Sequence, residues 1–201
     1  MRIGIIGPHT LNPDGSTQST RRRFPNLAIG MVESTWLQPY APKSLLDSYY
    51  YLNGNGVHEI LEVDWVQGSA LMARRQVYEQ IGGLDERYIM YSEELDWCKR
   101  AKEAGWVVTY VGSADIVHHG GKSTEQVVAR SHILFQQSKL RYFRKYHGAL
   151  AELVLRFFLI MNYLVQLAIE TAKFVLGHKR PMRRERMEAY WQIIRSGLKA
   201  H

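Results

Sequence analysis

The spacing of hydrophobic and polar residues predicts alternating strands and helices over the first part of the chain. Apolar runs rich in β-branched and aromatic residues predict three strands, at residues 2–7, 63–74 and 106–112. Helical spacing predicts two helices, at residues 75–81 and about 93–104, each followed by glycine. Ser92 precedes the second helix and suits its N-cap. Residues 26–56, including Tyr49–Tyr51, have no clear period and predict a mobile loop rather than a core element.

From about Glu125 onward the pattern predicts helix, and residues 153–176 are strongly apolar. The polar exceptions recur at steps of four, four and three and share one helical face; they are Asn162, Gln166, Glu170 and Lys173. The longest uncharged run, 157–169, is shorter than the roughly 20 residues of a membrane span. The segment is therefore either an amphipathic helix on a membrane surface or a core helix.

The distribution of charge favours the membrane surface. The chain has a formal net charge of +7, and residues 173–201 hold eight Lys or Arg against two Glu, which leaves +6 in this tail. Such a tail binds anionic partners. Nucleic acid is not expected, because the charge lies beside an apolar helix and not in a groove with interleaved aromatic side chains. Two smaller basic clusters, at residues 21–23 and 74–75, are either solvated or could hold a diphosphate.

Composition sets the class of protein. The chain has 201 residues, of which 46% are hydrophobic and 22% are charged, so it can form one packed domain of ordinary size. The single cysteine, Cys98, excludes an internal disulfide framework.

Three carboxylates lie within four positions at the start of the second predicted helix: Glu93, Glu94 and Asp96. One interpretation is structural, because negative charge stabilises the positive end of a helix dipole. The other is chemical. The preceding residues 88–91 are too apolar for an exposed loop, so the helix is predicted to start in a cleft bordered by Tyr91. A carboxylate in a cleft wall can act as a general base.

A second polar stretch, HHGGKST, occupies residues 118–124. A histidine at a strand end is commonly a surface residue, but His118 could also bind a metal or a phosphate. Gly120 would allow close backbone approach, and Ser123 offers a donor to phosphate oxygens. The stretch is not a P-loop, because the required first glycine would fall on Ile116.

Taken together, these stretches resemble the family-two glycosyltransferases of the GT-A fold, especially their rhamnosyltransferase-like members. Three blocks occur in the expected order, namely GIIGPHTLNPDGSTQSTRRRFP, then VDWVQGSALMARRQVYEQIGGLDERYIMYSEELDWCKRAKEAGWVV, then ADIVHHGGKST. The middle block is the most specific, because GGLDERY, the acid cluster and AGW have the expected spacing. The resemblance implies an α/β fold, a partial GT-A domain with a Rossmann-like mixed sheet, at residues 1–148. A basic, membrane-associating tail of amphipathic helices is expected at 149–201.

The resemblance also implies a reaction and a set of site residues. The reaction is an inverting sugar transfer from a nucleotide-sugar donor to an acceptor hydroxyl, with a divalent Mg or Mn ion on the leaving diphosphate. The family's acidic pair aligns with Glu93 and Glu94, and Glu94 stands where Asp is common. Glu94 is implied as the general base, with Glu93 and Asp96 orienting it or binding acceptor hydroxyls. His118 is implied at the metal or diphosphate, and the substrate contacts are expected from Trp65, Gly68, Arg74, Tyr91, Gly120 and Ser123.

In this family the nucleotide binds to an N-terminal half that ends in an acidic metal motif. Asn12-Pro13-Asp14 stands too early for that motif, because an α/β unit cannot be built from eleven residues. The chain is therefore expected to be an acceptor-side portion that is truncated, has a wrongly assigned start, is a remnant, or is paired with a separate donor half. Without a donor half, this chain alone is expected to show neither transferase activity nor tight nucleotide binding. The expected acceptor is a lipid-linked sugar or polysaccharide at the cytoplasmic, inner face of the plasma membrane. The alternative is a non-catalytic module that binds a lipid-linked sugar or a partner chain.

Overall fold

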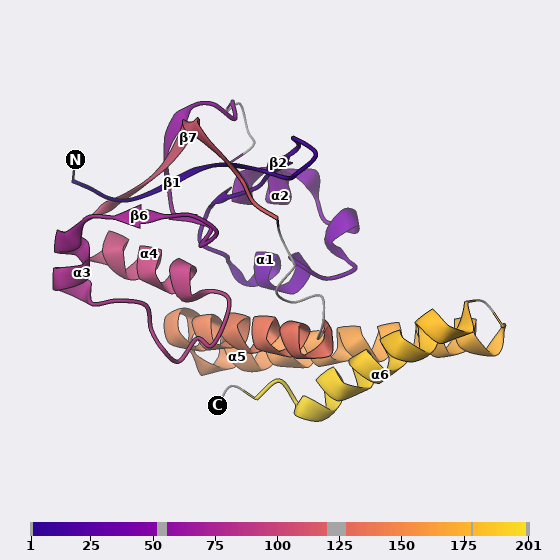
Figure 1. Cartoon of the computed structure of the whole chain (residues 1–201). Coiled ribbons are helices and arrows are strands. Elements are labelled where there is room, and N and C mark those ends of the chain that lie inside the picture. The colour runs from indigo at the N-terminus through magenta and orange to yellow at the C-terminus, as the bar shows by residue number, and fades with distance from the viewer. Residues whose placement is uncertain (1, 52–55, 120–127, 178, 200–201) are drawn as a thin grey trace. The chain divides into compact units, whose positions relative to one another are not determined.

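The computed structural model describes every residue except 1, 52–55, 120–127, 178 and 200–201. The chain divides into two compact units, one of Met1–Glu86 with Ser92–Gly121 and one of Arg87–Tyr91 with Lys122–His201. The first unit is mixed α/β and the second is helical (Figure 1). The predicted fold class, a partial Rossmann-like α/β domain followed by C-terminal helices, is confirmed.

A mixed sheet forms the centre of the first unit. Its order is β2-β1-β7-β4, with β6 also paired to β1. The strands are β1 (Ile3–Leu11), β2 (Thr17–Gln18), β4 (Ile60–Val63), β6 (Met72–Ala73) and β7 (Val107–Val117). The central pair β1 and β7 is parallel, and the other pairs are antiparallel. Ile5 and Val108, fully buried on these two central strands, belong to the core of the unit.

Both predicted helices are present between β6 and β7. They form part of the crossover connection that the parallel pair of β1 and β7 requires. They are α3 (Arg75–Ile81) and α4 (Glu93–Glu103). The glycines after them adopt left-handed backbone, with φ of 75° at Gly82 and 84° at Gly105. Ser92 occupies the N-cap position of α4, as predicted, but the expected capping bond of its hydroxyl is absent. Ser92 has φ 65° and makes no side-chain cap bond, since its left-handed backbone differs from the extended conformation typical of a capping serine.

Two predicted segments fold differently. Residues 63–74 are not one strand, because β5 (Trp65–Val66) leaves the main sheet to pair with β3 (Arg21–Arg22). Residues 26–51 are not merely a loop, since they form three short helices, α1 (Leu27–Val32), η1 (Gln38–Tyr40) and α2 (Lys43–Tyr49). Tyr49 is only 2% exposed and belongs to the core. Burying a large aromatic ring stabilises this segment although its sequence has no clear period.

The second unit is dominated by α5 (Val128–Val175) and α6 (Arg180–Ser196), which pack against each other. Gly148, with φ 88° and ψ 171°, kinks α5. Leu155 and Leu159 of α5 and Ile193 of α6 are almost fully buried. By length and composition alone, the described helix Ala129–Val175 could cross a membrane. The sequence did not predict this, because the longest uncharged run, 157–169, is shorter than a membrane span. A long core helix meets the same two criteria.

Candidate functional site

The acidic start of α4 meets the turn that follows β5. The backbone N–H of Gly68 donates a hydrogen bond to Glu94 Oε1 at 3.2 Å. A Cβ atom at position 68 would lie 3.4 Å from Glu94 Cδ, an ordinary van der Waals contact, so the carboxylate lies directly against the turn. Glu94 Oε2 is shielded from solvent and has no hydrogen-bond partner among the described residues. One oxygen of Glu94 is therefore held in place by the turn, and the other is buried without a partner among the described residues.

Glu93, the other member of the acidic pair, is half-buried. Its Oε2 is also shielded and has no partner among the described residues. Burial, and secondly the charge of Glu94, raise the pKa of the Glu93 carboxyl. Glu93 therefore retains its proton to a higher pH than an ordinary glutamic acid does.

Asp96, the third acid, makes a different set of contacts. It is fully buried, and Arg100 Nε donates a hydrogen bond to its carboxylate at 2.8 Å. The same guanidinium donates to the carbonyls of Ile81 and Gly83, each at 2.7 Å. Asp96 therefore acts through Arg100 to hold α4 against the end of α3.

The backbone leading into α4 is strained. Tyr91 and Ser92 both have positive φ, at 69° and 65°, which is uncommon for residues with side chains. Such strain persists only where the surrounding structure fixes it, and it is frequent at functional sites. Tyr91 itself belongs to the second unit, where its hydroxyl lies 2.8 Å from Ser131 Oγ.

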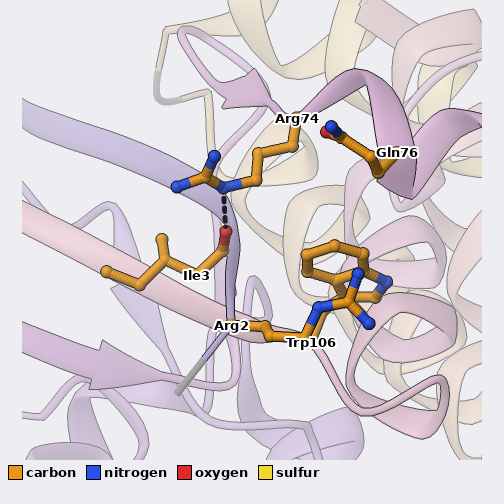
Figure 2. Close-up of a pocket in the computed structure, with 5 residues that line it drawn as sticks. All are labelled: Arg2, Ile3, Arg74, Gln76 and Trp106. Atoms are coloured by element: carbon orange, nitrogen blue, oxygen red, sulfur yellow. Dashed lines mark hydrogen bonds between the residues drawn. The ribbon is translucent and has the colours of Figure 1, made fainter.

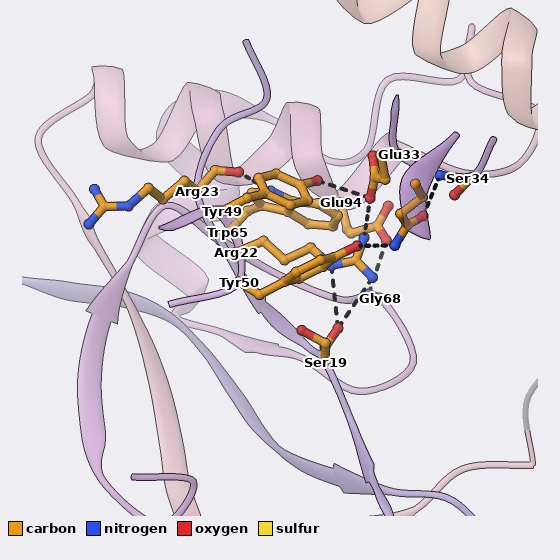
Figure 3. A network of polar contacts seen from close by, with 11 residues as sticks. Ser19, Arg22, Arg23, Glu33, Ser34, Tyr49, Tyr50, Trp65, Gly68 and Glu94 are labelled. Atoms are coloured by element: carbon orange, nitrogen blue, oxygen red, sulfur yellow. Dashed lines mark hydrogen bonds and ion pairs between the residues drawn. The ribbon is translucent and has the colours of Figure 1, made fainter. Parts of the chain in front are cut away.

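A polar network adjoins the contact between Glu94 and Gly68 (Figure 3). The Arg22 guanidinium lies between two aromatic rings, 4.9 Å from the centre of Trp65 and 5.4 Å from that of Tyr50. It donates a hydrogen bond to Glu33 Oε1 at 3.0 Å. Tyr49 donates its hydroxyl proton to the same oxygen at 3.1 Å. Burial, and secondly Glu33, raise the pKa of Tyr49 well above its usual value, so this phenol stays a donor at neutral pH.

Sequence reasoning found only part of this network. Trp65 was predicted as a pocket residue; it is 5% exposed, and its Nε1–H donates to the Arg23 carbonyl at 2.8 Å. The run of three arginines at residues 21–23 predicted a basic cluster, but the charge of Arg22 is neutralised by an ion pair with Glu33. Glu33 was missed because it lies in the segment predicted as a loop. A lone acid there gives no local signal of its partner.

Arg74 lies in a separate pocket of about 320 Å³ (Figure 2). Its Nε donates to the Ile3 carbonyl at 2.6 Å. Arg2 also lines this pocket and stacks on Trp106, with 4.1 Å between the guanidinium carbon and the ring centre. The described lining contains no carboxylate. The structure therefore does not bring Arg74 together with the acids of α4.

His118 follows β7 and is bound to β2. Its Nδ1 lies 3.1 Å from Gln18 Oε1, and Gln18 Nε2 donates to the His118 carbonyl at 2.8 Å. Within the described residues, no bond of His118 reaches the carboxylates of α4. Gly120 and Ser123 lie outside the described residues. A group with metal-binding potential is present elsewhere, at His9, His58 and Asp115, and it was not predicted from the sequence.

Comparison with known proteins supports the resemblance to glycosyltransferases. Over 128 residues the chain is 38% identical to the N-acetylglucosaminyl-diphospho-decaprenol L-rhamnosyltransferase of Mycobacterium tuberculosis, covering 61% of this chain and 39% of that relative. A low-salt glycan biosynthesis hexosyltransferase of Haloferax volcanii is 36% identical over 62 residues, covering 31% and 20%. A rhamnosyltransferase of Escherichia coli is 29% identical over 80 residues, covering 40% and 30%.

The chain thus spans about two fifths of the length of the mycobacterial relative. Neither a protein-family model nor a solved structure matches it. The predicted resemblance to rhamnosyltransferase-like enzymes of family two is confirmed for part of a domain.

Proposed function

We propose that this chain carries the acceptor-side part of an inverting glycosyltransferase, which moves a sugar from a nucleotide-sugar to a lipid-linked or polysaccharide acceptor. The similarity to rhamnosyl- and hexosyltransferases supports the reaction class. The names of the relatives support the acceptor class, since the mycobacterial enzyme is named for a sugar carried on a diphospho-lipid.

The observation that carries the proposal is the arrangement of Glu94. A general base needs a carboxylate oxygen within hydrogen-bond reach of the acceptor hydroxyl. Gly68 holds Glu94 Oε1, and Oε2 would make this contact once the acceptor displaces the groups that shield it from solvent. As the acceptor oxygen attacks the anomeric carbon, its proton passes to Glu94, and the bond from that carbon to the leaving diphosphate breaks. Glu93 lies next to the base and would accept a hydrogen bond from a second acceptor hydroxyl.

A divalent ion remains an expectation for the complete enzyme, in which it would neutralise the leaving diphosphate. The described contacts of His118 do not complete a site for Mg or Mn. Gln18 supplies an amide there, whereas these ions prefer several oxygen ligands with carboxylates among them. No step of the proposed reaction therefore depends on His118.

Glu94→Gln, compared with Glu103→Gln at the exposed end of the same helix, tests the proposal. The assay would use a protein that contains the donor-binding half together with this chain, and would follow transfer of labelled L-rhamnose from a nucleotide donor to a lipid-linked N-acetylglucosamine diphosphate, with Mg²⁺ or Mn²⁺ added. We expect Glu94→Gln to lower turnover about 10²–10⁴-fold with donor affinity unchanged. Glu103→Gln should behave as the parent. Intact turnover in Glu94→Gln would show that Glu94 is not the general base.

The same assay separates the second candidate function. A non-catalytic module would bind the lipid-linked sugar without turning it over, even when both substrates and the ion are present. Acceptor binding, measured on vesicles that contain the lipid, would then be the protein's activity. A chain that neither binds this acceptor nor transfers sugar would refute both candidates.

The second unit supports a location at the membrane surface. One face of α5 exposes apolar side chains at helical spacing of three and four. This apolar face comprises Leu150, Leu153, Val154, Phe157, Met161, Leu164, Val165, Ile169, Val175 and, just past the helix, Leu176. An exposed apolar stripe of this length is unusual for a water-facing helix and is typical of lipid contact.

The polar face of α5 lies on the opposite side, beneath α6. Asn162 and Glu170 are each less than a tenth exposed, and Arg183 of α6 donates to Glu170 at 2.7 Å. The outward surface of α6 is charged, with Arg184 and Arg186 exposed. This polarity suits α5 lying on the inner leaflet, with α6 facing the cytoplasm and its cations close to anionic headgroups.

A further inference from the structure

Three metal-ligating side chains converge at one end of the central sheet. His9 comes from β1, Asp115 from β7 and His58 from the segment before β4. One ring nitrogen of each histidine and one oxygen of the aspartate lie within 4.8 Å of one another. His58 and Asp115 lie 49 and 106 positions after His9 in the sequence, so no local motif predicts the group.

An irregularity of the parallel strand pair creates this convergence. Pro8 is paired with Val111, but the next residue, His9, is paired with Asp115, so residues 112–114 bulge out of register. Gly112 makes room for the segment that carries His58. A Cβ at Gly112 would lie only 2.4 Å from the Val57 carbonyl oxygen. The bulge therefore places Asp115 beside His9, and Gly112 lets the segment that carries His58 approach β7 closely.

The hydrogen bonds of the two imidazoles suit metal ligands. A ligating histidine usually binds a carbonyl or another polar group through its second ring nitrogen, which fixes the ring. His58 Nδ1 lies 3.3 Å from the Gly112 carbonyl, which leaves Nε2 as the ligand atom. His9 is 3% exposed, and its Nε2 lies 3.0 Å from Thr17 Oγ1. Its Nδ1 lies 2.7 Å from Asp115 Oδ1.

We propose that His9, His58 and Asp115 bind a zinc-class transition-metal ion. Two imidazoles with one carboxylate favour such an ion over Mg or Ca, and three protein ligands leave a fourth position for water. The metal would replace the proton shared by His9 Nδ1 and Asp115 Oδ1, and that proton would pass to solvent. Tetrahedral ligands with bonds of about 2.0 Å lie about 3.3 Å apart, so this pair must open slightly. Asp115 can move, because its side chain is 52% exposed.

The ion would stabilise a segment on which other residues depend. Gly56 accepts a hydrogen bond from Arg21 at 2.7 Å, and Val57 accepts one from Tyr110 at 2.6 Å. Both acceptors immediately precede His58. Metal binding would therefore fix this segment on β1 and β7. It would also hold Arg21, which immediately precedes Arg22 of the polar network. The inference does not depend on the proposed sugar transfer.

Calorimetric titration of the full chain with Zn²⁺, after treatment with a chelator, tests the site. We expect one ion per chain, and an affinity at least about 10-fold lower in His58→Gln and in Asp115→Asn. Both side chains are exposed, so circular dichroism should show both variants folded. His118→Gln and His119→Gln serve as matched controls with unchanged affinity. Co²⁺ in place of Zn²⁺ should give the visible absorption of a tetrahedral ion, and this absorption should weaken in the same two variants.

The proposal would be overturned by any of three results: no binding to the parent chain, equal binding by the parent, His58→Gln and Asp115→Asn, or loss of binding in His118→Gln alone. The last result would return the metal to the position implied by the family resemblance. Because the readouts are binding and spectroscopy, a chain without transferase activity would still give a decision.

Discussion

Gly68 and Glu94 meet through a backbone-to-carboxylate hydrogen bond of 3.2 Å although 26 positions separate them in the sequence. The contact joins the turn after β5 to the first turn of α4. It fixes one oxygen of the acid and leaves the other without a partner among the described residues. The turn, rather than a capping side chain, therefore sets the direction of the carboxylate.

A graded substitution series at Gly68 measures how much that direction matters. Gly68→Ala should be nearly neutral, because its Cβ would contact Glu94 Cδ at an ordinary distance of 3.4 Å. Gly68→Val adds two methyl groups and should displace the carboxylate, so we expect turnover to fall by about 10². Steady-state kinetics and melting temperatures of both variants check this. Equal turnover in the two variants would mean that the turn does not position Glu94.

Glu93→Gln should stabilise the fold near neutral pH. Because burial and Glu94 raise the pKa of Glu93, its ionisation in the folded state costs stability as pH rises through that raised pKa. Below the ordinary pKa of glutamate the acid is protonated in both states, so the advantage of glutamine should vanish. We expect a gain in melting temperature of about 1–3 °C at pH 7.5 and none at pH 3.5. A gain that was the same at both pH values would contradict this account.

The lone cysteine should be unreactive in the native protein. Cys98 is fully buried in α4, and burial raises the pKa of its thiol to about 12. At pH 8 we expect an aromatic disulfide reagent to label the native chain at least about 10³-fold more slowly than the urea-unfolded chain. Rapid stoichiometric labelling without denaturant would show that α4 opens readily.

The buried ion pair between α5 and α6 should be costly to break from one side. Glu170 and Arg183 are both less than a tenth exposed. Glu170→Gln leaves a buried guanidinium without its full charge partner, so we expect a loss of about 3 kcal/mol in the free energy of unfolding. The double variant Glu170→Leu with Arg183→Met should lose much less than the sum of the losses in Glu170→Leu and Arg183→Met alone, and a double-mutant cycle over these variants in urea measures the difference. Additive losses would contradict a direct interaction.

The apolar face of α5 should determine membrane binding. Phe157→Glu places a charge in that face, whereas Gln192→Glu adds the same charge to the exposed side of α6. We expect Phe157→Glu to weaken binding to anionic phospholipid vesicles about 10-fold or more and Gln192→Glu to weaken it only slightly. Co-sedimentation with vesicles provides the measurement. Equal weakening would indicate a purely electrostatic attachment.

Local signals explain why α3 and α4 could be predicted from the sequence. Both helices have clear spacing and end at glycines that adopt left-handed backbone. The partners of His9 and Arg22 could not be predicted. Asp115 reaches His9 through a bulge in the parallel pair, Trp65 reaches Arg22 through strand pairing, and Glu33 comes from the segment predicted as a loop. The same limit applies to α5. Periodicity identified its polar face, but only the packing of α6 determines that this face is buried and the apolar face is exposed.

The kink at Gly148 divides α5 into two rods that need not share a helical phase. The distal rod, from residue 149 to Val175, is about 40 Å long at 1.5 Å per residue. Whole turns could be inserted into or removed from it without rotating the proximal rod. One glycine therefore allows the length of the rod that carries the exposed apolar face to vary independently of the helix that precedes it.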